Sequence, residues 1–173
     1  RYSSTSRGLG DVYKRQVPAT PLGVQVLLNE INAKTEGSNI VIIGRSKLVG
    51  IPLALLLSSK SDLGNASVTI CHSKSKNIKS HTIKADIVVV ATGFPHTLTA
   101  DMVRKDSIVI DVGVNRIEDN TKKNGYRLIG DSDFEEIYEI ASKITPVPGG
   151  VGPMTIAMLL KNVTKAFLLN VKK

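Results

Sequence analysis

Four apolar runs, separated by segments with helical spacing, constrain the fold of this chain more than any other feature. They lie at residues 39–43, 67–71, 86–91 and 107–112 and consist mostly of Val and Ile. Strands that are apolar throughout, rather than at alternate positions, are typical of parallel sheets covered by helices on both faces. The runs therefore predict an α/β fold, a Rossmann-like doubly wound, mostly parallel sheet with flanking helices.

Helices are expected around and between these runs. Thr20 and Pro21 are typical of an N-cap and a first helical position, and apolar residues recur at helical spacing up to Ile31. A short fifth strand is expected at residues 127–129. Further helices are expected at residues 50–58, 77–84, 99–103, 133–142 and 155–169.

Composition narrows the classes of partner. Scattered lysines contribute much of the net charge of +8, but aromatic residues make up only 4% of the chain. Few aromatic side chains are therefore available to stack on the bases of a nucleic acid, and no nucleic-acid partner is expected. The longest apolar run, residues 48–57, is shorter than the ~20 residues that span a bilayer, so no membrane partner is expected. The single cysteine, Cys71, favours a reducing compartment such as the cytoplasm. The three histidines have no metal-ligand spacing, so no metal site is expected.

A glycine-containing turn follows the first apolar run. The sequence Gly44-Arg45-Ser46 leads to Gly50 and a predicted helix, which is the strand–turn–helix layout of a phosphate-binding site. Gly44 would let a phosphate approach the backbone, and free N–H groups at the start of the helix would point toward it. The spacing differs from the common G-x-G-x-x-G pattern, so an ordinary tight turn is the alternative interpretation.

The end of the second run indicates which dinucleotide would bind. Sites that prefer NAD commonly place an acidic residue there for the ribose 2′-hydroxyl, whereas this run ends in Cys71-His72-Ser73-Lys74. Arg45, Ser73 and Lys74 would suit a 2′-phosphate, so NADP is expected in preference to NAD. The alternative for Ser73 and Lys74 is an ordinary solvated loop.

Three more segments are candidates for ligand contact. Gly113 follows the fourth run and would let a nicotinamide or ribose approach, as would residues 91–93 after the third run. Residues 145–153 hold three prolines and three glycines, a composition that predicts a loop of one fixed shape. That loop is interpreted either as a tight turn before a helix or as a ligand-contact loop.

Together these motifs resemble one family, the bifunctional methylenetetrahydrofolate dehydrogenase/methenyltetrahydrofolate cyclohydrolases. The similarity extends from about Val17 to Phe167 and consists of six blocks in the family's order. The blocks are residues 18–23, 44–46 with 49–52, 71–73, 111–116, 130–131 and 146–155.

The resemblance implies an activity and a set of contacts. It implies NADP-dependent oxidation of 5,10-methylenetetrahydrofolate to 5,10-methenyltetrahydrofolate and hydrolysis to 10-formyltetrahydrofolate, within one-carbon metabolism. A tetrahydrofolate substrate, a homodimer through the Rossmann domain and a cytoplasmic location are implied with it. The implied cofactor-binding residues are Gly44, Arg45, Ser46, Ser73 and Val114, and the implied substrate-binding residues are Pro148, Gly149, Gly150, Val151 and Gly152.

The chain also departs from the family pattern. The family's catalytic Tyr-x-x-x-Lys pair is not found, because Val17 stands four places after Tyr13, so no catalytic residue is assigned and the chain alone is expected to be inactive. We expect a disordered or non-native leader at 1–16, an inter-domain helix at 17–36 and an NAD(P)-binding Rossmann domain at 37–154. Residues 155–173 are expected to form a helix that packs toward the family's N-terminal catalytic domain, which this chain lacks. The alternatives are a non-catalytic dinucleotide-binding module and another NAD(P) dehydrogenase of the same fold.

Overall fold

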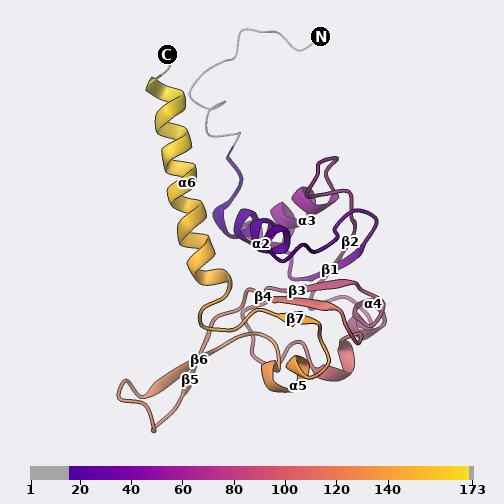
Figure 1. Ribbon diagram of the computed structural model, residues 1–173. Coiled ribbons are helices and arrows are strands. Elements are labelled where there is room, and N and C mark those ends of the chain that lie inside the picture. The colour runs from indigo at the N-terminus through magenta and orange to yellow at the C-terminus, as the bar shows by residue number, and fades with distance from the viewer. Residues whose placement is uncertain (1–15, 172–173) are drawn as a thin grey trace.

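A five-stranded parallel sheet forms the centre of the computed structural model, which describes residues 16–171 (Figure 1). The strand order is β2-β1-β3-β4-β7, so the chain builds one edge first and then crosses over β1 to build the other. Every pair of neighbouring strands in this sheet is parallel. This order confirms the predicted doubly wound α/β fold. The strands are β1 (Asn39–Ile43), β2 (Ser67–Cys71), β3 (Ile87–Val90), β4 (Ile108–Asp111) and β7 (Lys143–Ile144).

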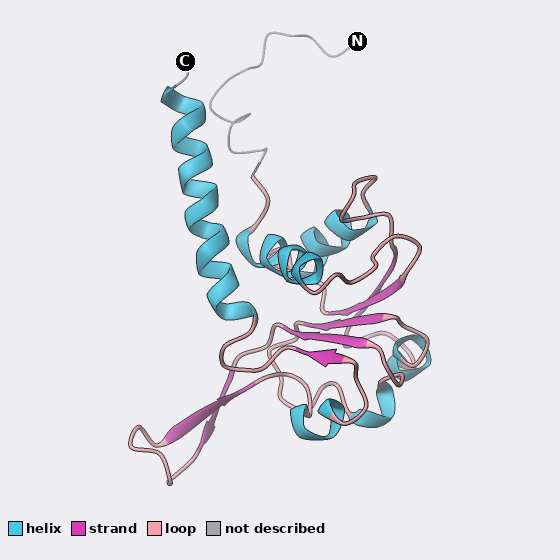
Figure 2. Cartoon of the chain, viewed as in Figure 1, coloured by secondary structure: helices cyan, strands magenta, loops and turns pink. Residues whose placement is uncertain are grey.

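Helices cover both faces of the sheet, as Figure 2 shows. One face carries α2 (Ala19–Glu30) and α3 (Gly50–Ser58), which contribute to the same buried cluster as alternate residues of the strands. The opposite face carries α4 (Ile78–Thr82), the 3-10 helix η1 (Ala100–Met102) and α5 (Phe134–Tyr138). The sheet is therefore the middle layer of three.

The side chains of β1 show why the strands are apolar throughout. Ile40 and Ile42 pack in the cluster under α2 and α3, whereas Val41 and Ile43 pack in the cluster on the other face. Successive side chains of a strand point to opposite faces, so a sheet covered on both sides needs an apolar residue at every position. All four side chains are at most 3% exposed. The strands are therefore packed on both faces, and this packing holds the ends of the strands in place.

Two elements project from this three-layer core (Figure 1). The strands β5 (Asn115–Glu118) and β6 (Tyr126–Ile129) form an antiparallel hairpin, in which the Arg116 guanidinium lies 4.9 Å from the centre of the Tyr126 ring. The long helix α6 (Val151–Val171) leaves the core in another direction. Its exposed apolar side chains are Ile156, Leu159, Leu160, Val163, Phe167, Leu168, Leu169 and Val171.

Close packing joins the first part of α6 to α2. The hydroxyl oxygens of Thr20 and Thr155 are 3.0 Å apart, and a Cβ built on Gly23 would lie 3.2 Å from the Cβ of Met154. The two helices therefore approach closely where small residues allow it. Gln16 adds a contact near the start of α2, because its side-chain amide donates to the carbonyl oxygen of Asn162 at 3.2 Å.

Several boundaries differ from the predictions. Helix α2 begins at Ala19, and Thr20 is not its N-cap, because the Thr20 hydroxyl is paired with α6 instead. Helix α5 is shorter than the predicted 133–142, and α6 begins at Val151 rather than at 155. The strands β5 and β7 were not predicted. Apart from Gln16, the predicted leader at 1–16 lies outside the described residues.

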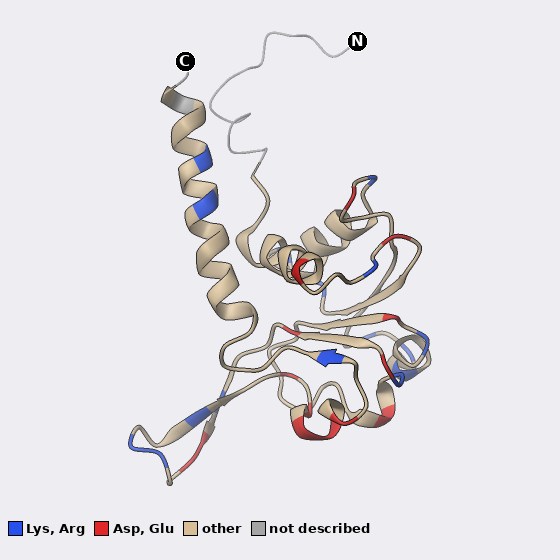
Figure 3. Cartoon of the chain, in the orientation of Figure 1, with Lys and Arg blue, Asp and Glu red and all other residues tan. Residues whose placement is uncertain are grey.

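Charged side chains are spread over the surface. Figure 3 shows Lys and Arg on several loops and at the tip of the β5–β6 hairpin, and acidic residues on α5. No helix within residues 16–171 combines the length and the apolar character needed to cross a bilayer.

Candidate functional site

The turn after β1 is shaped by one serine. Ser46 Oγ accepts a hydrogen bond from the backbone N–H of Val49 at 3.0 Å, and the Ser46 carbonyl oxygen accepts one from the N–H of Ile51 at 3.1 Å. These bonds close the turn and start α3 directly behind it. The strand–turn–helix layout predicted from the sequence is therefore present in the structure.

Two glycines let this turn lie close to its neighbours. Gly44 has a φ of +130°, and a Cβ there would lie 2.3 Å from the carbonyl oxygen of Ala91 at the end of β3. A Cβ on Gly50 would lie 2.1 Å from the carbonyl oxygen of Gly44. Side chains at these positions would force the turn away from the sheet. The two glycines therefore let the turn pack closely between the end of β3 and the start of α3.

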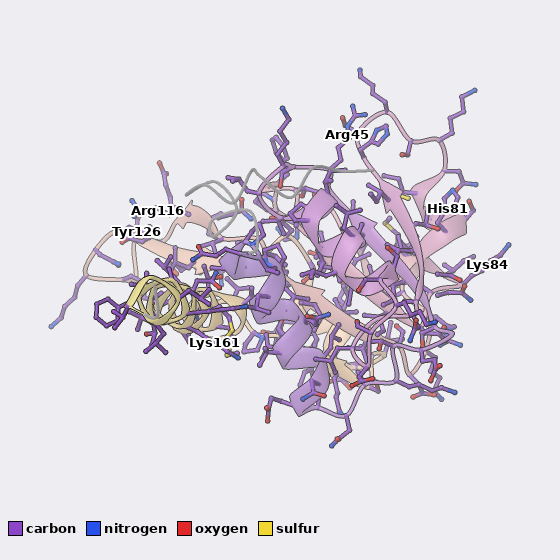
Figure 4. The ribbon with its side chains drawn as sticks, turned by 90° about the horizontal axis from the view of Figure 1, so that it is seen from above. Arg45, His81, Lys84, Arg116, Tyr126 and Lys161 are labelled. Atoms are coloured by element: carbon purple, nitrogen blue, oxygen red, sulfur yellow. The ribbon has the colours of Figure 1, made fainter. Side chains whose placement is uncertain are left out.

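The loop after β2 lies beside this turn. The Nη1 atom of Arg45 is 3.4 Å from the Nε2 atom of His72, which precedes Ser73. Arg45, Ser73 and Lys74 are exposed, and Figure 4 shows Arg45 at the rim of the molecule, well apart from Arg116 and Tyr126 of the hairpin. The structure thus brings Arg45 next to the loop that carries Ser73. It also adds His72, which the sequence interpretation had not assigned to the site.

A pocket of about 340 Å³ lies farther along the carboxyl edge of the sheet. It is lined by Val114 from the turn after β4 and by the loop that leads into α6. Gly149 has a φ of +107°, and a Cβ on Gly150 would lie 2.5 Å from the carbonyl oxygen of Pro146, so the shape of this loop depends on both glycines. Val114 therefore shares one pocket with Pro148, Gly149, Gly150, Val151 and Gly152.

The predicted residues thus form two groups on one edge of the sheet. Gly44, Arg45, Ser46 and Ser73 lie where β1 and β2 end, and Val114 lies beyond the end of β4 with the 148–152 loop. In doubly wound sheets a dinucleotide binds across this edge, near the point where the strand order reverses. The two groups therefore lie at different places along this edge, one at the ends of β1 and β2 and the other beyond the end of β4.

A buried carboxylate joins the end of β4 to the segment after β6. Asp111 is 2% exposed, and its Oδ1 atom accepts hydrogen bonds from the N–H groups of Gly113 at 2.9 Å and Asp131 at 3.0 Å. Its Oδ2 atom accepts from the N–H of Ser132 at 2.8 Å and from the Ser132 hydroxyl. Asp111 therefore fixes the turn that carries Val114.

A second buried carboxylate, Asp131, joins three loops. Its Oδ2 atom accepts from the N–H of Thr92 at 2.6 Å, the Thr92 hydroxyl at 2.9 Å and the N–H of Gly93 at 2.8 Å. Its Oδ1 atom accepts from the side-chain amide of Asn115 at 2.8 Å. The loop after β3 and the first residue of β5 are thereby both tied to Asp131.

These carboxylates rely on neutral donors. Burial raises the pKa of the Asp111 carboxyl above its usual value of 3.8, and the donated hydrogen bonds from Ser132, Asp131 and Gly113 oppose that rise. A Cβ on Gly130 would lie 2.0 Å from the Asp111 carboxylate, so the segment after β6 also needs a glycine to reach it.

A larger hollow of about 530 Å³ shares several lining residues with the pocket. It is lined by Asp111, Pro146 and Val147 and extends toward β6 and α5. His96 and Asp133 on its wall pair through Nδ1 and Oδ1. Among residues 16–171, no group of His, Cys, Asp and Glu side chains is arranged to hold a metal ion.

Comparison with known proteins identifies a matching family. The model described as "Tetrahydrofolate dehydrogenase/cyclohydrolase, NAD(P)-binding domain" matches residues 18–171. The bifunctional protein FolD of Pelodictyon phaeoclathratiforme is 53% identical over 159 residues, which cover 92% of this chain and 54% of that protein. The FolD of Cytophaga hutchinsonii is 50% identical over 153 residues, which cover 88% of this chain and 53% of that protein. The chain spans about half the length of the curated relatives that it matches.

Solved structures agree with this match. The FolD dehydrogenase/cyclohydrolase of Campylobacter jejuni superposes with a TM-score of 0.77 at 48% identity, covering 87% of this chain and 50% of that one. The methylenetetrahydrofolate dehydrogenase-cyclohydrolase of Trypanosoma brucei, solved with NADP cofactor and an inhibitor, has a TM-score of 0.84 at 37% identity and covers 95% of this chain and 56% of that one.

Proposed function

The chain belongs to the tetrahydrofolate dehydrogenase/cyclohydrolase family, as its NAD(P)-binding domain, and we propose that it binds NADP at the carboxyl edge of its sheet. In the complete protein this domain would serve the oxidation of 5,10-methylenetetrahydrofolate to 5,10-methenyltetrahydrofolate and its hydrolysis to 10-formyltetrahydrofolate. The observation that carries the proposal is the pocket in which Val114 meets the 148–152 loop. In this pocket Val114, the candidate contact for the nicotinamide, lies beside the 148–152 loop, the candidate contact for the folate.

The choice of NADP rests on the other end of the same edge. Arg45 lies beside the loop of Ser73, and residues 71–76 contain no acidic side chain that would bind a ribose 2′-hydroxyl and repel a phosphate. The Gly44–Ser46 turn provides the close backbone approach for the pyrophosphate. The relative from Trypanosoma brucei was solved with NADP.

Each group of residues has a distinct task in this proposal. NADP⁺, when bound, supplies the hydride acceptor. Gly44, Ser46 and Arg45 hold its phosphates, and Val114 supports its nicotinamide end. The 148–152 loop borders the folate, and its rigidity keeps the two reactants at a constant separation. Asp111 and Asp131 act through the loops that they fix.

A comparison of two cofactors tests the proposal. We expect isothermal titration calorimetry to show tighter binding of NADP⁺ than of NAD⁺. Arg45→Ala should weaken NADP⁺ binding by about 1.5–3 kcal/mol, the range for a hydrogen bond to a charged group, and leave NAD⁺ binding nearly unchanged. Lys161→Ala, on α6 and apart from Arg45 (Figure 4), is the matched loss of a surface cation. Equal affinity for both cofactors, or the same effect from both variants, would refute the assignment.

We further propose that two copies of the domain pair and that the protein works in the cytoplasm. The projecting β5–β6 hairpin and the hollow beside it offer a surface for a second copy, and the free thiol of Cys71 suits a reducing compartment. Sedimentation equilibrium tests the pairing, because a purely monomeric mass at micromolar concentration would contradict it.

A further inference from the structure

The turn that joins β5 to β6 holds the one Asn-Gly dipeptide of the sequence, Asn124-Gly125. Both residues are exposed, at the tip of the hairpin that projects from the core (Figure 1). Gly125 has a φ of +74°, and a Cβ built on it would have no atom within 4 Å. The peptide bond between the two residues is therefore open to solvent and free of neighbouring side chains.

An asparagine in this setting can react with its own backbone. The amide nitrogen of the following residue attacks the side-chain carbonyl carbon, forms a C–N bond and expels the side-chain nitrogen as ammonia, which leaves a cyclic imide. Water then opens the imide at either of its two carbonyl carbons and gives a normal or a β-linked aspartate. The net reaction adds one water and releases one ammonia, so it needs no oxidant, reductant or enzyme. A side chain on the following residue hinders the attack, and glycine has none.

The same turn contains a second asparagine that differs in this one respect. Asn120 is also exposed, but it is followed by Thr121, whose branched Cβ crowds the attacking nitrogen. The N–H of Gly125 donates to the Lys122 carbonyl oxygen at 3.0 Å, so this bond must open before the attack. Backbone hydrogen bonds in exposed turns with few buried contacts open readily. Asn124 is therefore the reactive asparagine of the turn.

The products would change both the charge and the backbone of the tip. A new carboxylate would stand next to Lys122 and Lys123, which give the tip its positive charge (Figure 3). A β-linkage would also add one carbon atom to the backbone. The turn is closed by the Asp119 N–H, which donates to the Gly125 carbonyl oxygen at 2.9 Å. Because turn length sets the register of a hairpin, the extra atom would break this bond.

We propose that Asn124 is a site of spontaneous modification, at which deamidation through Gly125 makes the hairpin tip less basic and opens the turn that closes it. This inference goes beyond the proposed function and does not depend on the cofactor. The hairpin belongs to the surface that we propose for a second copy, so the modification would give that surface a limited lifetime.

Peptide mass spectrometry tests the site, with Asn120 as an internal control. Trypsin, which cleaves after Lys and Arg, releases Asn120 in residues 117–122 and Asn124 in residues 124–127. After incubation of the full chain in mildly alkaline buffer, we expect loss of the unmodified 124–127 peptide. Two products of equal mass, the normal and the β-linked aspartate, should replace it. The 117–122 peptide should stay unmodified, as should both peptides of a chain digested without incubation. Equal conversion of the two peptides, or no conversion of residues 124–127, would overturn the proposal.

Two variants separate the change of charge from the change of backbone. Asn124→Asp has the new charge without the extra backbone atom, and Asn124→Gln keeps an amide that would have to form a larger, less favoured ring. We expect hydrogen exchange at the Asp119 N–H, followed by NMR, to become faster in the incubated wild type. It should be unchanged in Asn124→Asp and in incubated Asn124→Gln. Unchanged exchange in a wild-type sample that contains the β-linked product would refute the opening of the turn.

Discussion

Removal of the Asp131 carboxylate should destabilise this domain far more than removal of an exposed carboxylate. In Asp131→Ala the part-buried N–H groups of Thr92 and Gly93 lose their acceptor, at a cost of up to about 1–3 kcal/mol each. The Thr92 hydroxyl keeps a partner in the Thr97 hydroxyl at 3.0 Å, and the Asn115 amide keeps the Gly130 carbonyl. The sum predicts a loss of about 2–6 kcal/mol in the free energy of unfolding.

The isosteric variant Asp131→Asn separates the contribution of the Oδ2 hydrogen bonds from that of the Oδ1 hydrogen bond. In Asp131→Asn the amide oxygen can keep the three bonds at the Oδ2 position, and only the contact with the Asn115 amide is lost. We therefore expect a loss of about 1–2 kcal/mol, close to one hydrogen bond. Urea denaturation followed by circular dichroism measures both variants. Asp101→Ala, which removes an exposed partner of Lys79, is the control and should leave the midpoint unchanged.

Two outcomes would contradict these roles of the Asp131 carboxylate. A loss below about 1 kcal/mol in Asp131→Ala would mean that water satisfies the abandoned N–H groups. Equal losses in the two Asp131 variants would mean that the negative charge matters more than the geometry of acceptors. NADP⁺ affinity should fall in Asp131→Ala even under conditions in which the variant is folded, because the loops after β3 and β4 are no longer held together.

Three further predictions concern a glycine in the turn after β1, the buried Asp111 and the activity of the chain. Gly50→Ala should lower the free energy of unfolding in urea by about 1–3 kcal/mol, because the new Cβ would lie 2.1 Å from the Gly44 carbonyl oxygen. Gly152→Ala is the control and should leave the free energy of unfolding unchanged, because a Cβ at Gly152 would have no atom within 4 Å. Because burial raises the pKa of Asp111 in the folded state, the stability that Asp111 confers should be fully present below its usual value of 3.8 and should fall as the pH rises toward the raised pKa. The difference in unfolding free energy between wild type and Asp111→Asn should therefore shrink toward neutral pH, and a difference that grows with pH would contradict this. The 173-residue chain should bind NADP⁺ without oxidising 5,10-methylenetetrahydrofolate, and NADPH formation at about 1 per second in a spectrophotometric assay would show otherwise.

The sequence allowed the central sheet to be predicted because burial on both faces leaves a strong signal. Residues such as Val88 and Val89 lie on opposite faces and are both buried, so β3 reads as one apolar run. The strand β7 has only two residues, and β5 is mostly polar and alternates half-buried and exposed side chains in a projecting hairpin, so neither leaves such a run. The start of α2 was misplaced because the Thr20 hydroxyl finds its partner on α6, far away in the sequence.

The candidate site could be predicted only where local chemistry reveals it. Gly44 and Arg45 stand out in a short turn, and the Pro/Gly loop stands out by composition. Asp111 and Asp131 belonged to recognised blocks, but their task depends on donors brought together by folding. The only local signal was an acidic residue at the buried end of an apolar strand. His72 was missed because its partner nitrogen belongs to another loop.

Helix α6 begins in the wall of the pocket and ends far from it. Val151 is 4% exposed and belongs to the core, Gly152 lines the pocket, and the helix continues to Val171. At about 1.5 Å per residue its 21 residues form a lever arm roughly 30 Å long. A tilt of about 5° at its first turn carries the far end some 2.5 Å on this geometry, while the pocket wall shifts by only tenths of an ångström. A contact that tilts the far end of α6 would therefore change the wall of the pocket by a small amount. Ligand affinities of the pocket are comparable between two samples only when the far end of α6 has the same contacts in both.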